Sequence, residues 1–305
     1  MKHQWPHAIP DAAPIQGTIK ERYEDFQVDE IPAYEPSGIG DHVYFLIEKR
    51  GLATSRAVRD IARALRVRPR DMGVAGLKDA RGVTRQMLSL EHADPAQIEA
   101  LQLPRISVLR VSRHRNKLRM GHLVGNRFTI KVRDTDLSRV AELRKRVEIL
   151  TRRGVPNYYG SQRFGNRGDT WQIGRELLLG NPENAAHIIA GRPNPEDEGE
   201  VLRARELFDA RRFEQSVAAW PSGFAECKAL AGNLARNGED YGRAVMKLDR
   251  KALGFYVSAY QSWLFNKVLE DRIEGYHEIE EGDLAWKHDS GAVFLVETPA
   301  AERPR

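Results

Sequence analysis

The first part of the chain alternates apolar and polar residues over short stretches, which is the pattern of half-buried strands. Residues 42–49 (HVYFLIEK) are rich in β-branched and aromatic side chains. Residues 26–30 alternate in the same way after a charged turn at 21–25. Further strands are predicted at 15–19, in both arms of 72–90, at 106–113 and at 127–133.

One early segment has helical rather than strand periodicity. Thr54 or Ser55 is expected to cap a helix that runs to Val67, with Val58 and Ile61 on its apolar face. The second face of this helix carries arginines at spacings of three and four residues, namely Arg56, Arg59, Arg63 and Arg66. This face either keeps the helix soluble or contacts phosphates, and the pattern leaves both interpretations open.

Helical periodicity dominates the second part of the chain. After an amphipathic helix at 137–153, the pattern predicts helices at 170–179, 182–190, 201–210, 212–219, 223–236 and 251–272, with a polar linker at 193–200. The strands of the first part show no regular alternation with helices. We therefore expect an α+β protein with a mixed sheet, followed by an α-rich region that begins near residue 165.

Composition limits the class of protein further. The 305 residues are 41% hydrophobic and 30% charged, as in a folded soluble protein. No run of about 18 apolar residues exists, so no membrane span is expected. The first six residues lack the apolar stretch of a secretion signal, and we expect a cytoplasmic protein. Cys227 is the only cysteine, which excludes an intrachain disulfide or zinc knuckle, and it is expected to be a small buried residue.

The basic residues are unevenly distributed along the chain. Residues 101–153 contain fifteen Lys or Arg and four Asp or Glu, whereas the rest of the chain contains 33 basic and 39 acidic residues. A basic zone on an otherwise acidic protein favours a polyanionic partner, because each phosphate contact releases counterions. Part of this zone is also explained by a solvated basic helix face.

Several kinds of enzyme are excluded by missing motifs. The chain has no GxGxxG after a strand and no GxxxxGK[ST], HExxH or GxSxG motif. The nine histidines do not show the spacing of metal ligands, so no metal is expected. Any chemistry must then come from carboxylates, amides, aromatic rings and basic groups.

A glycine-containing turn presents Asp79 between Lys78 and Arg81. Neighbouring cations stabilise the ionised carboxylate that a nucleophile requires. Taken alone, the same aspartate is better explained as a turn residue that bonds its own backbone.

Two other segments combine residue types found at RNA sites. Residues 157–165 (NYYGSQRFG) pair aromatic rings with amides and an arginine, which suits either a stacked base or a buried aromatic corner. Residues 114–128 are predicted to form a basic hairpin with a glycine-rich tip. In the segment 19–30, Glu24 and Asp25 could form an acid/base pair, but adjacent residues of a strand point to opposite faces and do not easily serve one centre. They are therefore interpreted as solvated turn charges.

In combination and order, these segments resemble the TruD family of pseudouridine synthases. The matching segments are Lys20–Glu30 (KERYEDFQVDE), Gly76–Gln86 (GLKDARGVTRQ), His114–Phe128 (HRNKLRMGHLVGNRF), Asn157–Gly165 (NYYGSQRFG) and Ser258–Asn266 (SAYQSWLFN). The resemblance implies the pseudouridine-synthase fold, with a mixed, largely antiparallel sheet and a helix-rich TRUD insertion domain.

The resemblance also implies a reaction. Family members isomerise a uridine of tRNA, typically uridine 13, to pseudouridine without a cofactor, and tRNA is the expected partner. Asp79 corresponds to the family's nucleophile, which attacks ribose C1′ or takes part in proton removal at C2′. The uridine must leave the RNA stack to be reached.

Other site residues follow from the same resemblance. Phe26 and Tyr159 are expected to stack on the uracil, although relatives often have phenylalanine at the position of Tyr159. Asn157 is expected to bond the uracil edge, and Lys20 to stabilise Asp79 as a carboxylate. The expected phosphate contacts are Arg115, Lys117 and Arg163.

The expected domains are a catalytic domain at 1–160 and the TRUD insertion domain at 161–305, with tRNA in a basic cleft between them. The resemblance also implies a strand at 292–297. Beyond it the family continues with a strand and helix that return to the catalytic sheet, and this segment is expected to be missing here. Two other functions remain open: a non-catalytic RNA-binding protein or tRNA chaperone, and an N-glycosidase that releases the base. The sequence does not indicate the oligomeric state.

Overall fold

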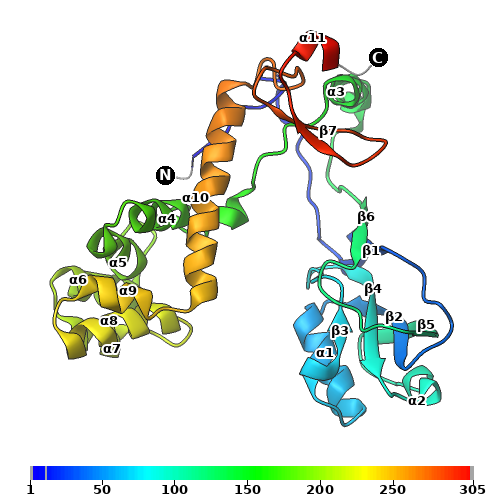
Figure 1. Ribbon diagram of the computed structural model, residues 1–305, viewed down its shortest axis with the longest axis horizontal. Coiled ribbons are helices and arrows are strands. Elements are labelled where there is room, and N and C mark those ends of the chain that lie inside the picture. Colours follow the sequence, from blue (N-terminus) through cyan, green and yellow to red (C-terminus); the bar gives the residue numbers. More distant parts are fainter. Residues whose placement is uncertain (1–2, 11, 303–305) are drawn as a thin grey trace. The chain divides into compact units, whose positions relative to one another are not determined.

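The computed structural model describes residues 3–10 and 12–302, which form two compact units. The first, here called the sheet unit, is Ala13–Leu143. The second, the helical unit, consists of Arg144–Arg305 together with Met1–Ala12, as far as these residues are described. Figure 1 labels the helices and strands of both units.

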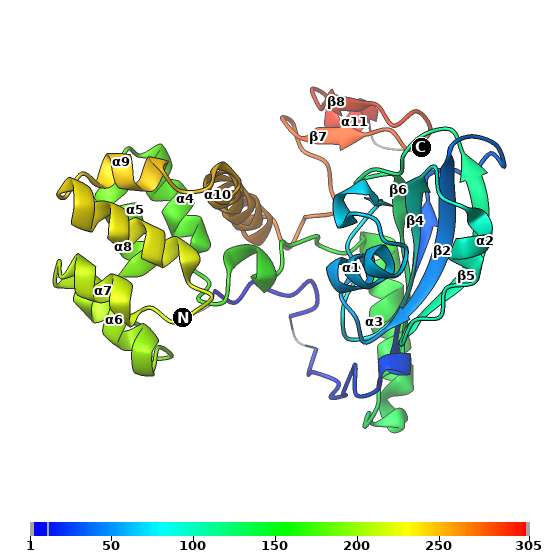
Figure 2. The same cartoon turned by 90° about the horizontal axis from the view of Figure 1, so that it is seen from below.

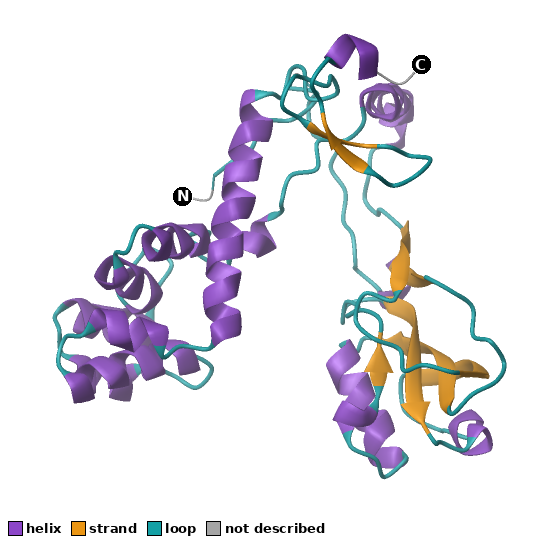
Figure 3. Cartoon of the chain, viewed as in Figure 1, coloured by secondary structure: helices purple, strands orange, loops and turns teal. Residues whose placement is uncertain are grey.

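The sheet unit contains six strands, drawn in orange in Figure 3: β1 (Phe26–Pro32), β2 (His42–Arg50), β3 (Gly73–Val74), β4 (Val83–Glu91), β5 (Ile106–His114) and β6 (Leu123–Ile130). Five of them follow the order β5-β2-β4-β1-β6, and β3 pairs with β4. β1 and β4 run parallel, and the other pairings of this sheet are antiparallel. The predicted mixed, largely antiparallel sheet is confirmed.

Alternation along β2 directs successive side chains to opposite faces of the sheet. Val43, Phe45 and Ile47 are fully buried and pack against helix α1 (Thr54–Ala64), which lies along this face (Figure 2). Tyr44 belongs to a smaller cluster on the other face. Lys49 is the next residue in the row that faces α1, and it is as buried as its apolar neighbours.

Short helices complete the connections of the sheet unit. They are the 3-10 helices Tyr23–Asp25, Pro69–Asp71 and Leu137–Arg139 and the helix α2 (Pro95–Glu99). Of these, only Leu137–Arg139 falls within a predicted helix, the one at 137–153. Helix α3 (Val140–Arg153) leads from this unit into the helical unit, close to the helix predicted at 137–153.

The predicted strand at 15–19 is wrong. Thr18 forms a single isolated bridge with Arg133, and no strand includes this segment. The interpretation of Asp25 as a solvated charge is also wrong. Asp25 is only 2% exposed, because it accepts two hydrogen bonds of 2.7 Å from the Arg133 guanidinium. These bonds lower the pKa of Asp25 to about 2.

The predicted hairpin at 114–128 is wrong as well. β5 pairs with β2 at one edge of the sheet, and β6 pairs with β1 at the other edge. The basic segment between them therefore connects opposite edges instead of turning back on itself. Local alternation identified both strands but carried no information about their partners.

The predicted helix at 54–67 ends three residues early, because Arg66 has a left-handed backbone with φ of 57°. Neither proposed cap forms. Ala53 occupies the N-cap position, and Thr54 is the first helical residue. The Thr54 hydroxyl instead accepts a hydrogen bond from the Lys78 backbone, which places α1 beside the turn that carries Asp79.

The helical unit contains α4 (Thr170–Leu178), α5 (Pro182–Ala190), α6 (Gly199–Asp209), α7 (Phe213–Ala219), α8 (Ala225–Asn237), α9 (Tyr241–Met246) and α10 (Arg250–Asp271). Six of these match the predicted helices within about two residues, and only α9 was missed. The last described part holds the two-stranded sheet of β7 (Leu284–Trp286) and β8 (Val293–Leu295) and the short helix α11 (Pro299–Glu302). The strand predicted at 292–297 is therefore present.

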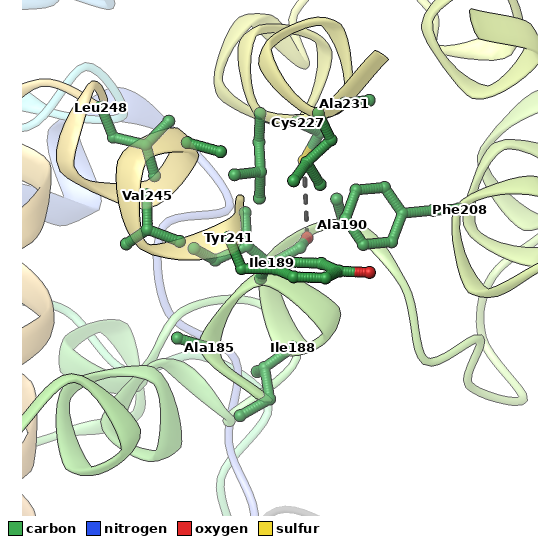
Figure 4. Close-up of a cluster of buried hydrophobic side chains, with 14 of the residues drawn as sticks. Ala185, Ile188, Ile189, Ala190, Phe208, Cys227, Ala231, Tyr241, Val245 and Leu248 are labelled. Atoms are coloured by element: carbon green, nitrogen blue, oxygen red, sulfur yellow. Dashed lines mark hydrogen bonds between the residues drawn. The ribbon is translucent and has the colours of Figure 1, made fainter. Parts of the chain in front are cut away.

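Close packing joins these helices around one core. A Cβ atom at Gly174 of α4 would lie 2.0 Å from the Tyr256 carbonyl oxygen of α10, so only glycine permits this approach. The core between the other helices includes Phe208, Tyr241 and Cys227, whose thiol donates to the Ile189 carbonyl (Figure 4). Burial raises the pKa of Cys227 to about 11, so its predicted role as a small buried residue is confirmed.

The two compact units divide the chain at Leu143, whereas the domains expected from the resemblance divide it at residue 160. A compact unit is defined by contacts within it, whereas a catalytic domain is defined by the residues that it contributes to the reaction. The assignment of 1–160 and 161–305 to a catalytic and an insertion domain therefore stays a prediction.

Candidate active site

The turn between β3 and β4 carries Asp79 and passes close to the start of β1. A Cβ atom at Gly82 would lie 2.5 Å from the Phe26 carbonyl oxygen, so the turn can only approach β1 with glycine at this position. This approach fixes the turn next to the Phe26 ring. It explains why the segment resembling the family needs glycine shortly after the aspartate.

Lys20 connects Asp79 to Phe26. Its ammonium group lies 3.4 Å from the Asp79 Oδ1 atom and 3.8 Å from the centroid of the Phe26 ring. The backbone of Lys20 is left-handed, with φ of 59°, and its carbonyl accepts a hydrogen bond from Arg81. The structure thus brings three predicted site residues together, with the Asp79 carboxylate about half exposed at 49%.

Lys49, which the sequence analysis did not identify, holds the turn through a hydrogen bond to its backbone. The Lys49 Nζ atom donates to the Asp79 carbonyl at 2.9 Å and to the Leu52 carbonyl at 2.5 Å. Burial lowers the pKa of Lys49 to about 8, against the opposing attraction of the nearby Asp79 charge. Lys78 acts in the same direction as burial, because it carries a like charge. A buried ammonium group therefore contacts the backbone of the expected nucleophile.

Further buried side chains fix the two sides of the turn. The Thr54 hydroxyl accepts from the Lys78 backbone and donates to Gln86, both at 2.8 Å. The Lys78 ammonium group lies 2.6 Å from Glu30, and both side chains are nearly inaccessible to solvent. Glu30 also accepts from the Met87 backbone at 3.0 Å. These contacts hold the backbone around Asp79 rigid while its carboxylate remains open to solvent.

In the helical unit, the segment of Asn157 and Tyr159 is attached to α10. The Asn266 side chain accepts from the Tyr159 N–H at 2.8 Å and donates to the Tyr159 carbonyl at 3.0 Å. Asn266 is fully buried, and the Tyr159 ring packs edge-on against Phe265. The ring itself remains 44% exposed, and Asn157 is exposed beside it.

Arg163 is held by the same helix. Its Nε atom donates to the Ser262 hydroxyl at 3.0 Å, and its Nη2 atom donates to the Ser258 hydroxyl. The guanidinium group also lies 5.8 Å from the centre of the Tyr159 ring and 5.2 Å from that of Phe255. Arg163 therefore fixes the aromatic segment as well as offering a positive charge.

The other two predicted phosphate contacts lie in the segment that connects β5 to β6 of the sheet unit. Arg115 is exposed, and the Lys117 ammonium group donates to the Arg70 carbonyl at 3.1 Å.

The residues that sequence reasoning missed had different signals. Lys49 occupies the inward-facing row of an otherwise apolar strand, so the alternation of β2 contained the clue. Ser258, Ser262 and Asn266 recur every four residues, which places them on one face of a helix. Glu30 gave no comparable signal, because its burial depends on Lys78 in a distant part of the sequence.

Among the described residues, no group of three or more His, Cys, Asp or Glu side chains is arranged to hold a metal ion. Within residues 3–10 and 12–302, no helix is both long enough and apolar enough to cross a bilayer.

The chain has the fold of a pseudouridine synthase. A crystal structure of a TruD protein from Methanosarcina mazei superposes with a TM-score of 0.85 at 30% sequence identity. The superposition covers 97% of this chain and 71% of the other.

Sequence comparison leads to the same family. The family described as "tRNA pseudouridine synthase D (TruD)" matches residues 6–305. The tRNA pseudouridine synthase D of Geobacter metallireducens is 46% identical over 290 residues, which are 95% of this chain and 72% of that protein. Its counterpart in Geobacter sulfurreducens is 43% identical over 95% of this chain and 71% of the relative. The chain belongs to the TruD family of tRNA pseudouridine synthases.

Proposed function

We propose that this chain is a tRNA pseudouridine synthase that isomerises uridine 13 of tRNA, with Asp79 as the nucleophile. Family membership supports the activity and the substrate class. The observation that carries the role of Asp79 is its contact with Lys20, whose ammonium group also lies over the Phe26 ring. A half-exposed carboxylate is thereby paired with a cation that also covers an aromatic ring. Phe26 is only 7% exposed, so the Lys20 side chain must turn aside before a base can stack on the ring.

The proposed reaction needs no external redox partner, because it only exchanges one bond to the ribose for another. An Asp79 oxygen bonds to C1′ while the C1′–N1 bond breaks, and uracil leaves with the electron pair. The uracil then turns so that C5 faces C1′. The C5–C1′ bond forms as the carboxylate departs, C5 loses its proton, and N1 gains one.

The neighbouring residues have distinct roles in this scheme. Lys20 pairs with the Asp79 carboxylate before attack and pairs with it again when it departs from C1′. Phe26 and Tyr159 stack on the extruded uracil, which returns about 1–3 kcal/mol of the unstacking cost per base. Asn157 bonds the uracil edge, since its amide both donates and accepts. Arg115, Lys117 and Arg163 contact tRNA phosphates.

The test is the Asp79→Asn variant. This substitution keeps the size of the side chain but replaces the carboxylate, whose oxygen attacks C1′, with a neutral amide. Pseudouridine formation in bulk unmodified tRNA, measured without added cofactor, should fall by at least about 10⁴-fold. The Asp71→Asn variant removes a surface carboxylate of the same unit and should retain activity.

Other outcomes separate the alternatives. Equal turnover by the wild type and Asp79→Asn would disprove the assigned role. Tight tRNA binding by a wild type that forms no pseudouridine would identify a binding protein. Release of free uracil would identify an N-glycosidase, and product mapped to another position would disprove the choice of uridine 13.

A further inference from the structure

A cavity of about 620 Å³ opens on the sheet unit between α1 and the turn that precedes β5. Its apolar surface includes Leu52 and Leu103. Three guanidinium groups and one carboxylate also line it: those of Arg56, Arg63 and Arg105, and that of Asp60. Two of the four arginines that the sequence left between two interpretations, Arg56 and Arg63, thus face a defined space, whereas Arg59 and Arg66 do not line it.

The charges of this cavity favour an anion. Asp60 lies 2.9 Å from the Arg56 Nε atom and 3.7 Å from Arg63, so a single carboxylate is shared by two cations. The lining as a whole carries two more positive than negative charges. The side chains of Arg56 and Arg63 are 58% and 78% exposed, so they can turn to a ligand at little cost in desolvation.

The cavity is next to the Asp79 turn. The Lys49 ammonium group that donates to the Asp79 carbonyl also donates to the carbonyl of Leu52, which lines the cavity. Gly51 donates to the Gly82 carbonyl of the turn and accepts, at 3.5 Å, from the Arg105 guanidinium. Hydrogen bonds of the segment 49–52 thus connect the turn of the proposed nucleophile to Leu52 and Arg105 of the cavity lining.

The backbone of Arg105 supports a role for its side chain. Arg105 has φ of 65°, a left-handed conformation that glycine or asparagine adopts with less strain. Strained residues of this kind concentrate at binding and catalytic sites. Here the strained position carries one of the three guanidinium groups of the cavity.

We propose that this cavity binds a backbone phosphate of the RNA substrate next to the extruded uridine. The inference rests on the proposed function, because it requires a uridine at Asp79. Guanidinium groups match the geometry of a phosphodiester, and an extruded nucleotide stays covalently attached to its flanking phosphates. The phosphate contact holds the strand while the base leaves the stack.

The experiment compares Arg63→Ala and Arg105→Asn with Arg59→Ala. Asparagine tolerates the left-handed backbone at 105, and Arg59 is an exposed residue of α1 outside the cavity lining. Binding of unmodified tRNA is measured over a range of salt concentrations. Each cavity variant should lower affinity roughly three- to tenfold and reduce the salt slope by about one, since one phosphate contact is lost. The Arg59→Ala variant should match the wild type.

A tRNA with an uncharged methylphosphonate next to the target uridine locates the contact. The wild type should bind this modified tRNA more weakly than normal tRNA. The Arg63→Ala variant should bind the two tRNAs equally well. Cavity variants that behave like Arg59→Ala, or that remain sensitive to the methylphosphonate, would overturn the proposal. These are binding measurements, so an inactive chain that gives the expected pattern would refute the proposed function and not the phosphate site.

Discussion

Lys49 is the residue with the most unusual environment in the candidate site. Burial makes its positive charge unfavourable, yet the ammonium group holds the carbonyls of Asp79 and Leu52 in place. A neutral amine still has two protons to donate to these carbonyls, so the turn can keep its geometry when Lys49 loses its charge.

The depressed pKa of Lys49 predicts how stability changes with pH. Below about pH 8 the folded and unfolded chains both hold this proton. Between pH 8 and the ordinary pKa of 10.5, the unfolded chain holds more protons, so this group makes the fold more stable as pH rises. Between pH 8 and 10.5, the free energy of unfolding of the wild type should rise by at most about 3 kcal/mol relative to that of Lys49→Met.

Urea unfolding at pH 7 to 10.5 measures this difference in the free energy of unfolding. The Lys117→Met variant serves as a control, because Lys117 lies in a surface segment. A difference between wild type and Lys49→Met that stays constant over the whole range would contradict the assignment.

At the scale of single residues, the sequence predicted which residues lie together in the candidate site better than it predicted which charged residues are buried. The resemblance selected Lys20, Phe26 and Asp79, which lie together in the structure. It did not indicate that Asp25 is buried, because that depends on Arg133, more than a hundred residues away. Burial of a charged group is decided by its tertiary partner.

At the scale of elements, α10 organises the aromatic segment of the helical unit. Ser258, Ser262 and Asn266 lie on one face of the helix and bond either Arg163 or the Tyr159 backbone. The exposed Tyr159 residue is thereby attached to a long helix through its backbone and through Arg163.

Loss of this support should affect both stability and substrate use. Asn266→Ala leaves the N–H and carbonyl of Tyr159 without their partner and should cost about 2 kcal/mol of stability. It should also reduce kcat/KM for tRNA, because the Tyr159 ring is no longer fixed. Asn266→Asp keeps the acceptor for the N–H and should be less damaging to the ring position.

Thermal unfolding and steady-state kinetics test this prediction. Asn233→Ala provides a matched control on α8, since the Asn233 amide donates only to a carbonyl of its own helix. If Asn266→Ala and Asn233→Ala have the same kinetics, α10 does not position Tyr159.

Elements with strong local periodicity were predicted well, whereas strand pairing was not. The helices from α4 to α10 have periodic apolar faces that pack on one core. The segment 114–128 suggested a hairpin because its strands are neighbours in sequence. Their true partners are β2 and β1, and only the assembled sheet determines that choice.

At the scale of the whole molecule, the chain has separate hydrophobic cores. The core of the sheet unit includes Ile61, the core of the helical unit includes Leu230, and both side chains are fully buried. No residue of the described chain belongs to both clusters. The sequence predicted this change in character near residue 165 but not the compact boundary at Leu143, because α3 runs through that boundary without a linker.

Separate cores predict separate responses to mutation. Ile61→Ala and Leu230→Ala each remove a buried side chain and should cost about 2–5 kcal/mol. Hydrogen exchange should show loss of protection in the sheet unit for Ile61→Ala and in the helical unit for Leu230→Ala. Equal loss in both units from either substitution would mean that the two cores unfold as one.

The pairing of β1 with β6 has a practical consequence. Phe26 lies opposite Ile130, and Thr18 bridges Arg133, so the chain enters and leaves the sheet unit at the same place. A linker of a few residues could join these positions and close the unit into a ring, with new ends opened in the exposed loop at 35–40. Such a circular permutant would keep Lys20, Phe26 and Asp79 in place and turn this half of the enzyme into a transplantable cassette.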